Sequence, residues 1–166
     1  MVYNQSLAMD PRILELTLPP DWEAVRAVWD SCRGMLERSG LPPDEAYSLA
    51  MVAQELLENA VKYGAGGADG IRLSLRVEEE DVTVVVVSRV GEDDTHVRAF
   101  GGAVQRIRER PDSFDAYVER LQQVALRPYA PGGSELGLAR IAYEGRCALD
   151  FSLDAGFLAV SAVYRR

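Results

Sequence analysis

The chain has 166 residues, 48% of them hydrophobic, and a formal net charge of −8 at pH 7. This length and apolar content suit a single globular domain with one hydrophobic core. The negative charge argues against a nucleic-acid partner, because binding to a polyanion needs a basic patch.

The first part of the sequence predicts one strand followed by two helices. Leucines alternate with polar residues over 13–18, which is the period of a half-buried strand. Asp21 suits the N-cap of a long helix that we expect to run to Gly40. A second helix is expected from Asp44 to about Tyr63, where a glycine-rich segment ends it.

Two strands and a helical insert come next. Apolar and polar residues alternate over 71–77, which predicts a strand with one solvent-exposed face. Residues 82–87 are almost uninterrupted valine, which predicts a strand near the middle of the sheet, covered on both faces. Helical spacing returns over 91–131. We expect its apolar stripes, Phe114 and Leu121 included, to pack into the core rather than to form a partner-binding or dimer surface.

The end of the chain predicts a short helix and a hairpin. The helix is expected over 136–144, after a glycine-containing turn. Residues 147–153 and 157–164 alternate on either side of Asp154-Ala155-Gly156, which predicts two antiparallel strands. The element order predicts an α+β fold, a two-layer α/β sandwich with helices on one face of a mostly antiparallel sheet. We expect one domain over 1–166, with a helical insert at about 92–131.

Two further features bear on the location of the protein. Cys32 and Cys147 are far apart and form no C-x-x-C pair, so we expect two buried thiols rather than a disulfide framework or a zinc site. The first residues lack a basic region followed by an apolar run, and no stretch approaches the ~20 apolar residues of a membrane helix. The sequence therefore predicts a cytoplasmic protein.

Residues 51–64 hold a row of polar side chains. Glu55 and Asn59 are one helical turn apart and Lys62 follows, so that a carboxylate, an amide and an ammonium share one side of the helix. By itself the row also fits a solvated helix face. The opposite side is apolar and is expected to pack on the core: Leu49, Val52, Ala53, Leu56 and Ala60.

A second candidate is the turn that contains Gly132, Gly133 and Gly137. Glycine before a helix exposes backbone N–H groups at the positive end of the helix dipole, where phosphates bind. The same glycines fit a simple helix entry with tight packing.

Taken in chain order, the helix with the polar row, the two strands, the insert and the glycine turn resemble the GHKL, or histidine-kinase-like, ATPase superfamily. Residues 55–63 match its N-box, and residues 135–141 match the core of its second glycine box. The resemblance runs from about residue 13 to the end of the chain. Because position 55 is Glu and no dimerisation or phosphoacceptor helices precede the domain, the chain looks closest to the small anti-sigma-factor serine kinases. The insert and the run over 136–144 look like those of SiaB-type protein kinases.

The resemblance implies a Bergerat fold, ATP and Mg²⁺ as cofactors, and serine/threonine protein kinase activity. It implies a small STAS-like anti-anti-sigma protein, or a sigma-type regulator, as the partner in bacterial signalling. The resemblance leaves open whether the protein forms a homodimer. Glu55 would take the proton of the attacking hydroxyl, and Asn59 would bind the metal. Nucleotide contacts would come from Lys62, Tyr63, Gly132, Gly133, Leu136 and Gly137.

The first glycine box of that superfamily, Asp-x-Gly-x-Gly, is missing. After the valine strand the chain reads Ser88-Arg89-Val90-Gly91-Glu92-Asp93-Asp94. In that box the aspartate accepts a hydrogen bond from the amine of adenine. A site without this acceptor distinguishes adenine less well from other bases. The alternative is therefore a catalytically inactive module that sequesters a regulatory protein without ATP turnover.

A third hypothesis, a plain ATP hydrolase, lacks support because no residue beyond Glu55 is marked to position a water molecule. His96 shows no metal partner and is expected on the surface.

Overall fold

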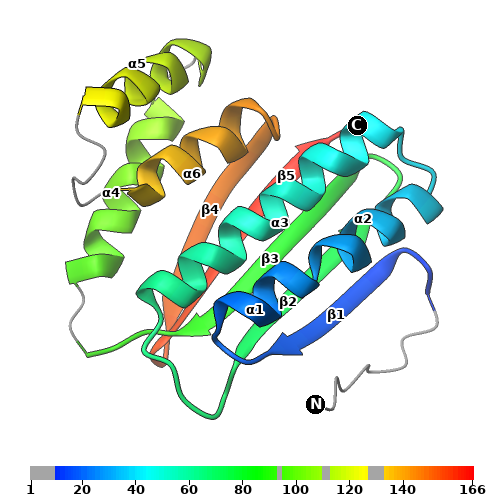
Figure 1. The fold of residues 1–166 in the computed structure, drawn as a ribbon, viewed down its shortest axis with the longest axis horizontal. Helices are drawn as coiled ribbons and strands as arrows, with labels where there is room; N and C mark the ends of the chain where they lie inside the picture. The colour runs from blue at the N-terminus through cyan, green and yellow to red at the C-terminus, as the bar shows by residue number, and fades with distance from the viewer. Residues whose placement is uncertain (1–9, 93–94, 110–112, 127–132) are drawn as a thin grey trace.

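The fold is a sheet covered by helices on one side (Figure 1). The computed structural model describes residues 10–92, 95–109, 113–126 and 133–166. The strands are β1 (Ile13–Leu18), β2 (Ile71–Val77), β3 (Asp81–Arg89), β4 (Cys147–Asp154) and β5 (Phe157–Arg165). The helices are α1 (Trp22–Ala27), α2 (Trp29–Arg38), α3 (Pro43–Tyr63), α4 (Thr95–Glu109), α5 (Ser113–Leu126) and α6 (Gly133–Tyr143).

The strand order is β1-β2-β3-β5-β4, and every neighbouring pair is antiparallel. The last strand of the chain is therefore inserted between β3 and β4. The predicted two-layer α+β sandwich is confirmed, and the sheet is antiparallel throughout the part of the chain that the structure describes.

Helix α3 is the centre of the helical layer. It packs on β2 and β3 and against α1, α2 and α6. Pro43 occupies the first turn, where its missing N–H costs no hydrogen bond. The apolar side predicted from the sequence is buried, which confirms that expectation: Leu49, Val52, Ala53, Leu56 and Ala60.

The long helix predicted after Asp21 is divided in two. Asp21 is the N-cap as expected, since its Oδ1 accepts a hydrogen bond from the Ala24 N–H at 2.7 Å. The division falls at Val28, whose N–H bonds to the Val25 carbonyl three residues back rather than four. This tighter turn redirects the helix while the Val28 side chain stays buried.

Strand β3 lies in the middle of the sheet as predicted, but the expectation that both its faces are covered is wrong. Burial alternates along the strand: Val82, Val84 and Val86 are buried, and Val85 and Val87 are only half-buried. None of the described helices lies on the face to which Val85 and Val87 point (Figure 1).

The insert consists of two helices that differ in their packing. On α4, Phe100 and Val104 are buried as expected. On α5, Phe114 is 49% exposed and Leu121 is 40% exposed, so the predicted core packing of that stripe is wrong. The reason is that α5 packs against α6 rather than on the sheet.

The predicted C-terminal hairpin is confirmed. Its turn is formed by Ala155 and Gly156, both with positive φ, as a type I′ hairpin turn requires. Cys32 and Cys147 are unpaired and buried as expected, and burial raises the pKa of each thiol to about 12. Within the described residues, no helix is both long and apolar enough to cross a membrane.

Candidate functional site

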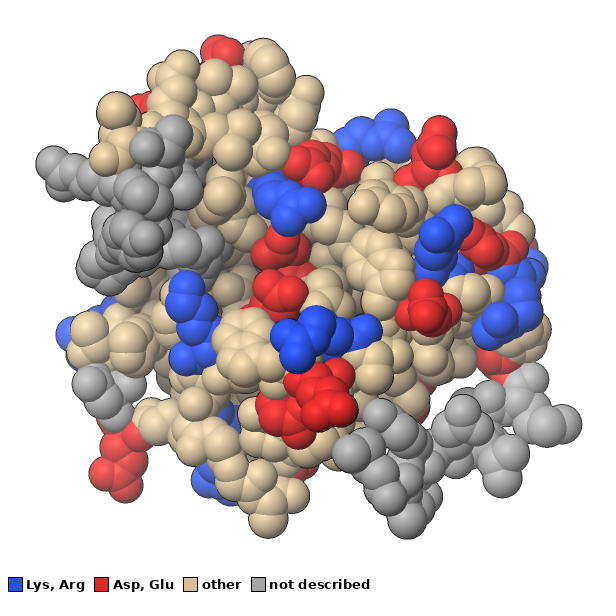
Figure 2. All heavy atoms as spheres, viewed as in Figure 1, with Lys and Arg blue, Asp and Glu red and all other residues tan. Residues whose placement is uncertain are grey.

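Charged side chains gather where α3 and α6 meet. Figure 2 shows acidic and basic residues following one another in a row across these two helices. At its centre Arg140 Nη1 donates a hydrogen bond to Glu55 Oε1 at 2.5 Å, and the Glu55 side chain is only 17% exposed. The carboxylate predicted to be a base is therefore ion-paired inside the helical layer.

Gly137 leaves the space that Glu55 occupies. A Cβ atom at position 137 would lie 2.5 Å from Glu55 Oε2, closer than real Cβ atoms come to a neighbour. Helix α6 begins at Gly133 rather than at Leu136 as expected, which puts Gly137 in its second turn. Its N–H is then used by the helix, and the free N–H groups of α6 are those of the first four residues, Gly133 to Leu136.

A chain of hydrogen bonds extends from this ion pair to the helical insert. Arg140 Nη2 lies 3.5 Å from Glu144 Oε2, and the hydroxyl of Tyr117 on α5 donates to Glu144 Oε1 at 2.6 Å. The Tyr117 ring also stacks on Tyr143, with ring centroids 5.2 Å apart. Hydrogen bonds therefore connect α5 to Glu55 through Arg140 of α6 and Glu144, which follows the end of α6.

The environment of Glu55 favours its protonated form. Burial raises the pKa of its carboxyl group, the positive charge of Arg140 opposes the rise, and the nearby carboxylates of Glu58 and Glu144 add to it. The net direction is upward. A carboxylate with a raised pKa is a better proton acceptor than an ordinary surface glutamate.

Asn59 lies one turn after Glu55 and lines a cavity between α3, α4 and the sheet. Its Nδ2 is buried and has no hydrogen-bond partner among the described residues. A buried amide without a partner is costly, so this group suits a ligand that supplies one. A phosphate oxygen would accept from Nδ2, and the reversed amide would offer its oxygen to Mg²⁺.

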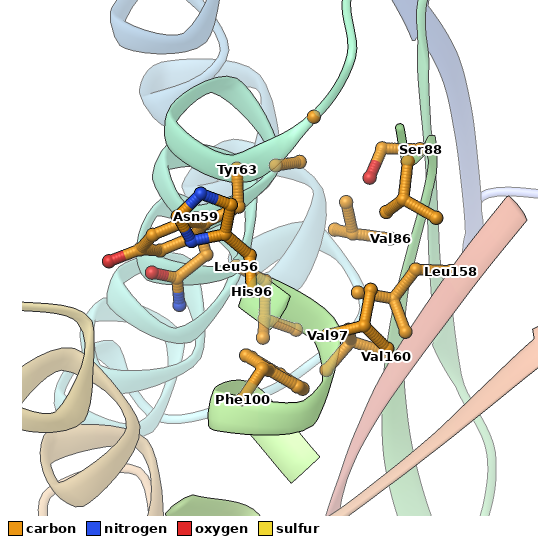
Figure 3. Close-up of a pocket in the computed structure, with 13 residues that line it drawn as sticks. Leu56, Asn59, Tyr63, Val86, Ser88, His96, Val97, Phe100, Leu158 and Val160 are labelled. Carbon is orange, nitrogen blue, oxygen red and sulfur yellow. The ribbon is translucent and has the colours of Figure 1, made fainter. Parts of the chain in front are cut away.

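The cavity itself is nearly filled by the start of α4. Figure 3 shows His96 beside Tyr63, with Val97 and Phe100 of the same helix extending toward the strands. The rings of His96 and Tyr63 have centroids 5.6 Å apart. The remaining volume, about 20 Å³, holds roughly one water molecule. A purine ring is several times larger and enters only if α4 moves.

The other predicted site residues are placed as follows. Tyr63 lines the cavity, whereas Lys62 is exposed, with its ammonium 5.3 Å from the Tyr63 ring centroid. Gly133 and Leu136 belong to the first turn of α6, and Gly132 lies outside the described residues. Ser88, at the position of the missing aspartate, is buried and lines the same cavity. The structure therefore brings Asn59, Tyr63 and Ser88 together and leaves Lys62 outside.

Sequence reasoning missed two residues of this site. Arg140 was predicted only as part of the run over 135–141 and not as a partner of Glu55. Its spacing from Glu144 nevertheless places both residues on one side of the predicted helix. His96 is exposed, as expected, yet it lines the cavity, with its ring beside Tyr63. No group of three or more acidic, histidine or cysteine side chains that could hold a metal occurs in the described part of the chain. A metal here would therefore depend on Asn59 and on the ligand's own oxygens.

A family model, described as the histidine kinase-like ATPase domain, matches residues 18–125. The chain belongs to this family. The matched range includes α3 with Glu55 and Asn59, so the resemblance predicted from the sequence is confirmed. Membership of the histidine kinase-like ATPase family implies nucleotide binding. Among curated proteins, no sequence matches the chain.

Two solved structures share the fold. The first is a chain of the SiaB–SiaC complex from Pseudomonas aeruginosa, with a TM-score of 0.65 and 20% identity, over 94% of this chain and 92% of that chain. The second contains the RsbU and RsbW domains of Rv1364c from Mycobacterium tuberculosis, with a TM-score of 0.54 and 16% identity. The match to the second covers 92% of this chain and 32% of the longer chain.

Proposed function

We propose that this domain is an ATP-dependent serine/threonine protein kinase of the anti-sigma-factor type, acting on a small STAS-like regulatory protein. The observation that carries the proposal is the pairing of Glu55 and Asn59 on α3. One is a half-buried carboxylate with a raised pKa, and the other is an amide whose buried nitrogen has no hydrogen-bond partner among the described residues. The family and the two structural neighbours, which come from complexes or fusions of regulatory proteins, support this class.

Each residue has a defined task in this proposal. ATP supplies the transferable phosphoryl group. Asn59 would bind Mg²⁺ or a phosphate oxygen, and the free N–H groups of Gly133 to Leu136 would bind phosphate at the positive end of α6. Lys62 is exposed and would have to turn toward the phosphates.

Glu55 would receive the proton from the serine or threonine hydroxyl of the partner. Its Oε1 is bonded to Arg140, whereas Oε2 lies against Gly137 and makes no hydrogen bond to Arg140. Arg140 stabilises the ionised carboxylate and fixes its position, so Oε2 would be the proton acceptor.

A second candidate is a partner-binding module without ATP turnover. The specific observation in its favour is the cavity beside Asn59, which holds only about one water molecule because side chains of α4 fill it. Ser88 stands where the family's adenine-reading aspartate would be. Under this hypothesis the α3 and α6 surfaces bind a protein and the pocket stays closed.

Thermal unfolding with Mg-ATP separates the two candidates. A ligand at ~100 times its dissociation constant stabilises the native state by roughly 2.7 kcal/mol, which is about 5–10 °C for a chain of this length. The kinase proposal expects such a shift for the wild type and its loss for Asn59→Ala. No shift at millimolar Mg-ATP would favour the module.

A phosphotransfer assay then tests the role of Glu55. We expect Glu55→Gln to lose at least 100-fold in transfer rate while keeping the Mg-ATP thermal shift, because a general base contributes about 10²–10⁴-fold. The matched control is Glu58→Gln, which removes a neighbouring carboxylate of α3 that hydrogen-bonds with Gln54 instead. Equal rates for the two variants would remove Glu55 from the base role.

A further inference from the structure

Ser88 is a polar residue on the sheet side of the cavity beside Asn59. It is 6% exposed, and it is the only buried serine, threonine, amide or charged residue among those whose burial the structure describes. Figure 3 shows it on β3, across the cavity from Asn59. The lining that the neighbouring strand positions contribute is apolar: Val86, Leu158 and Val160. A base placed against the sheet therefore meets one side chain that can form hydrogen bonds.

The hydroxyl of Ser88 can act as a donor or as an acceptor. It lines the cavity and makes no hydrogen bond to another described residue. A serine hydroxyl rotates about its bond to carbon, donates one hydrogen bond and accepts up to two, whereas an ionised carboxylate only accepts. Ser88 can therefore pair with either kind of group on a ligand.

The backbone N–H groups at this end of the cavity are already used. Gly64 and Val90 both line the cavity. The Gly64 N–H donates to the Ala60 carbonyl and the Val90 N–H to the Gly156 carbonyl, each at 2.9 Å. Neither N–H is left to distinguish one base from another.

The rings and the helix on the other side treat all purines alike. Tyr63 and His96 have ring centroids 5.6 Å apart, and aromatic side chains stack on any base because every base has a π-face. Val97 and Phe100 of α4 fill the cavity down to about 20 Å³, so they have to move for adenine and guanine equally. Recognition of the base is thus left to Ser88.

We infer that this site binds purine nucleoside triphosphates without distinguishing adenine from guanine, an inference that rests on the proposed function. Adenine carries an amino group at C6, from which the Ser88 hydroxyl accepts a hydrogen bond. Guanine carries a carbonyl oxygen at C6, to which the same hydroxyl donates one. The triphosphate beside Asn59 is identical in the two nucleotides. Ser88 is therefore the residue that determines the base tolerance of the site.

The expected tolerance follows from the cost of unpaired polar groups. A site built to bind one N–H or O–H group of its substrate rejects an analogue that lacks it by about 10⁴–10⁵-fold, because polar groups of the site are then left unpaired. A rotating hydroxyl is left unpaired by neither purine. We expect the dissociation constants of Mg-ATP and Mg-GTP to agree within about 3-fold.

Isothermal titration calorimetry of the full chain with Mg-ATP and with Mg-GTP tests the inference. Ser88→Asp introduces a group that only accepts, so binding of Mg-GTP should weaken at least about 10-fold relative to Mg-ATP. Titration at pH 8 keeps that carboxylate ionised, since burial raises the pKa of a carboxyl group. Ser31→Asp is the matched control. It adds the same charge at an exposed position of α2 that does not line the cavity, and it should leave the ratio of the two constants unchanged.

Circular dichroism identifies a Ser88→Asp chain that fails to fold, and Ser88→Ala then takes its place. This change removes one hydrogen bond from either purine, so both dissociation constants should rise by a similar factor of about 2–10. A ratio of the two constants that changes about 10-fold or more in Ser88→Ala would overturn the inference, because one base alone would then depend on the hydroxyl.

The outcomes for this inference differ from those for the proposed function. A wild type that binds Mg-ATP at least about 10-fold more tightly than Mg-GTP would overturn the inference and leave the kinase proposal intact. A folded Ser88→Asp chain that keeps the wild-type ratio would also overturn the inference alone. A wild type that binds neither nucleotide at millimolar concentration would overturn the proposed function and the inference with it.

Discussion

Glu55 on α3 and Arg140 on α6 are 85 residues apart in the sequence and are joined by a 2.5 Å hydrogen bond between their charged groups. The Glu55 side chain is 17% exposed and that of Arg140 is 37% exposed, so the pair is partly screened by water. The pair still holds α6 against α3 and fixes the carboxylate to which we assign the proton transfer.

The pH dependence of stability reports on this carboxylate. Because the pKa of Glu55 is raised above its ordinary value of 4.5, the folded protein binds the proton more tightly than the unfolded chain. Its contribution to stability is present below pH 4.5 and is lost as the pH rises through the folded-state pKa. The stability of Glu55→Gln relative to wild type should then be greater at pH 7.5 than at pH 4, by about 1.4 kcal/mol per unit of pKa difference. Urea denaturation at both pH values measures it, and equal differences would contradict the assignment.

Gly137→Ala should lower the rate of phosphotransfer while changing the stability of the fold only slightly. The new Cβ would lie 2.5 Å from Glu55 Oε2, and the flexible end of that side chain can move away. The loss of the Arg140 contact is offset by the ~1 kcal/mol gain of replacing glycine by alanine in a helix. We expect the melting temperature to change by only a few degrees and phosphotransfer to fall at least 10-fold.

The double variant Gly137→Ala with Glu55→Ala provides the control for that clash. Once the carboxylate is absent, alanine at 137 should be more favourable for stability than it is in the wild type. Additive effects of the two changes on the free energy of unfolding would show that Gly137 and Glu55 do not interact.

Two adjacent glycines of α4 should respond in opposite directions to alanine. A Cβ at Gly101 would lie 2.8 Å from Cζ of Phe151, a rigid ring on β4, whereas at Gly102 the nearest atom is the end of Arg106 at 3.4 Å. Gly101→Ala should destabilise by about 1–3 kcal/mol through overpacking, and Gly102→Ala should stabilise by about 0.5–1 kcal/mol. Thermal melts of the two variants test this, and a stabilised Gly101→Ala would refute the close packing of α4 on β4.

Tyr117→Phe should loosen α5 selectively. It removes the 2.6 Å hydrogen bond to Glu144, worth about 0.5–1.5 kcal/mol, and keeps most of the stacking on Tyr143. We expect faster amide hydrogen exchange over 113–126 and unchanged exchange in α3. Equal acceleration in both helices would indicate that Tyr117 supports the whole domain instead. The same bond raises the pKa of Tyr117, so its phenol should titrate above 10 in the wild type.

Local patterns in the sequence predict most of the elements, because their causes are local. Asp21 caps a helix through its own neighbours, and the leucines of β1 alternate because one side of the strand is buried. The failures have non-local causes. The exposure of Phe114 depends on α5 packing against α6 instead of the sheet. The half-burial of Val85 depends on a face of the sheet on which none of the described helices lies.

The site was predicted in part for the same reason. Glu55 and Asn59 share one helix, so their spacing in the sequence fixes their relation. The contact of Glu55 with Arg140 depends on how two distant helices meet, and no periodicity encodes it. Likewise, the place of His96 in the lining of the cavity depends on where α4 starts after β3.

The position of β5 has a consequence for synthesis in the cell. This strand, residues 157–165, lies between β3 and β4, so β3 has one unpaired edge until almost the whole chain has left the ribosome. Until then a valine-rich strand is open to other nascent chains, which favours aggregation. Chaperone binding during translation should therefore concentrate on 81–89, and folding of the sheet should be a late, long-range event.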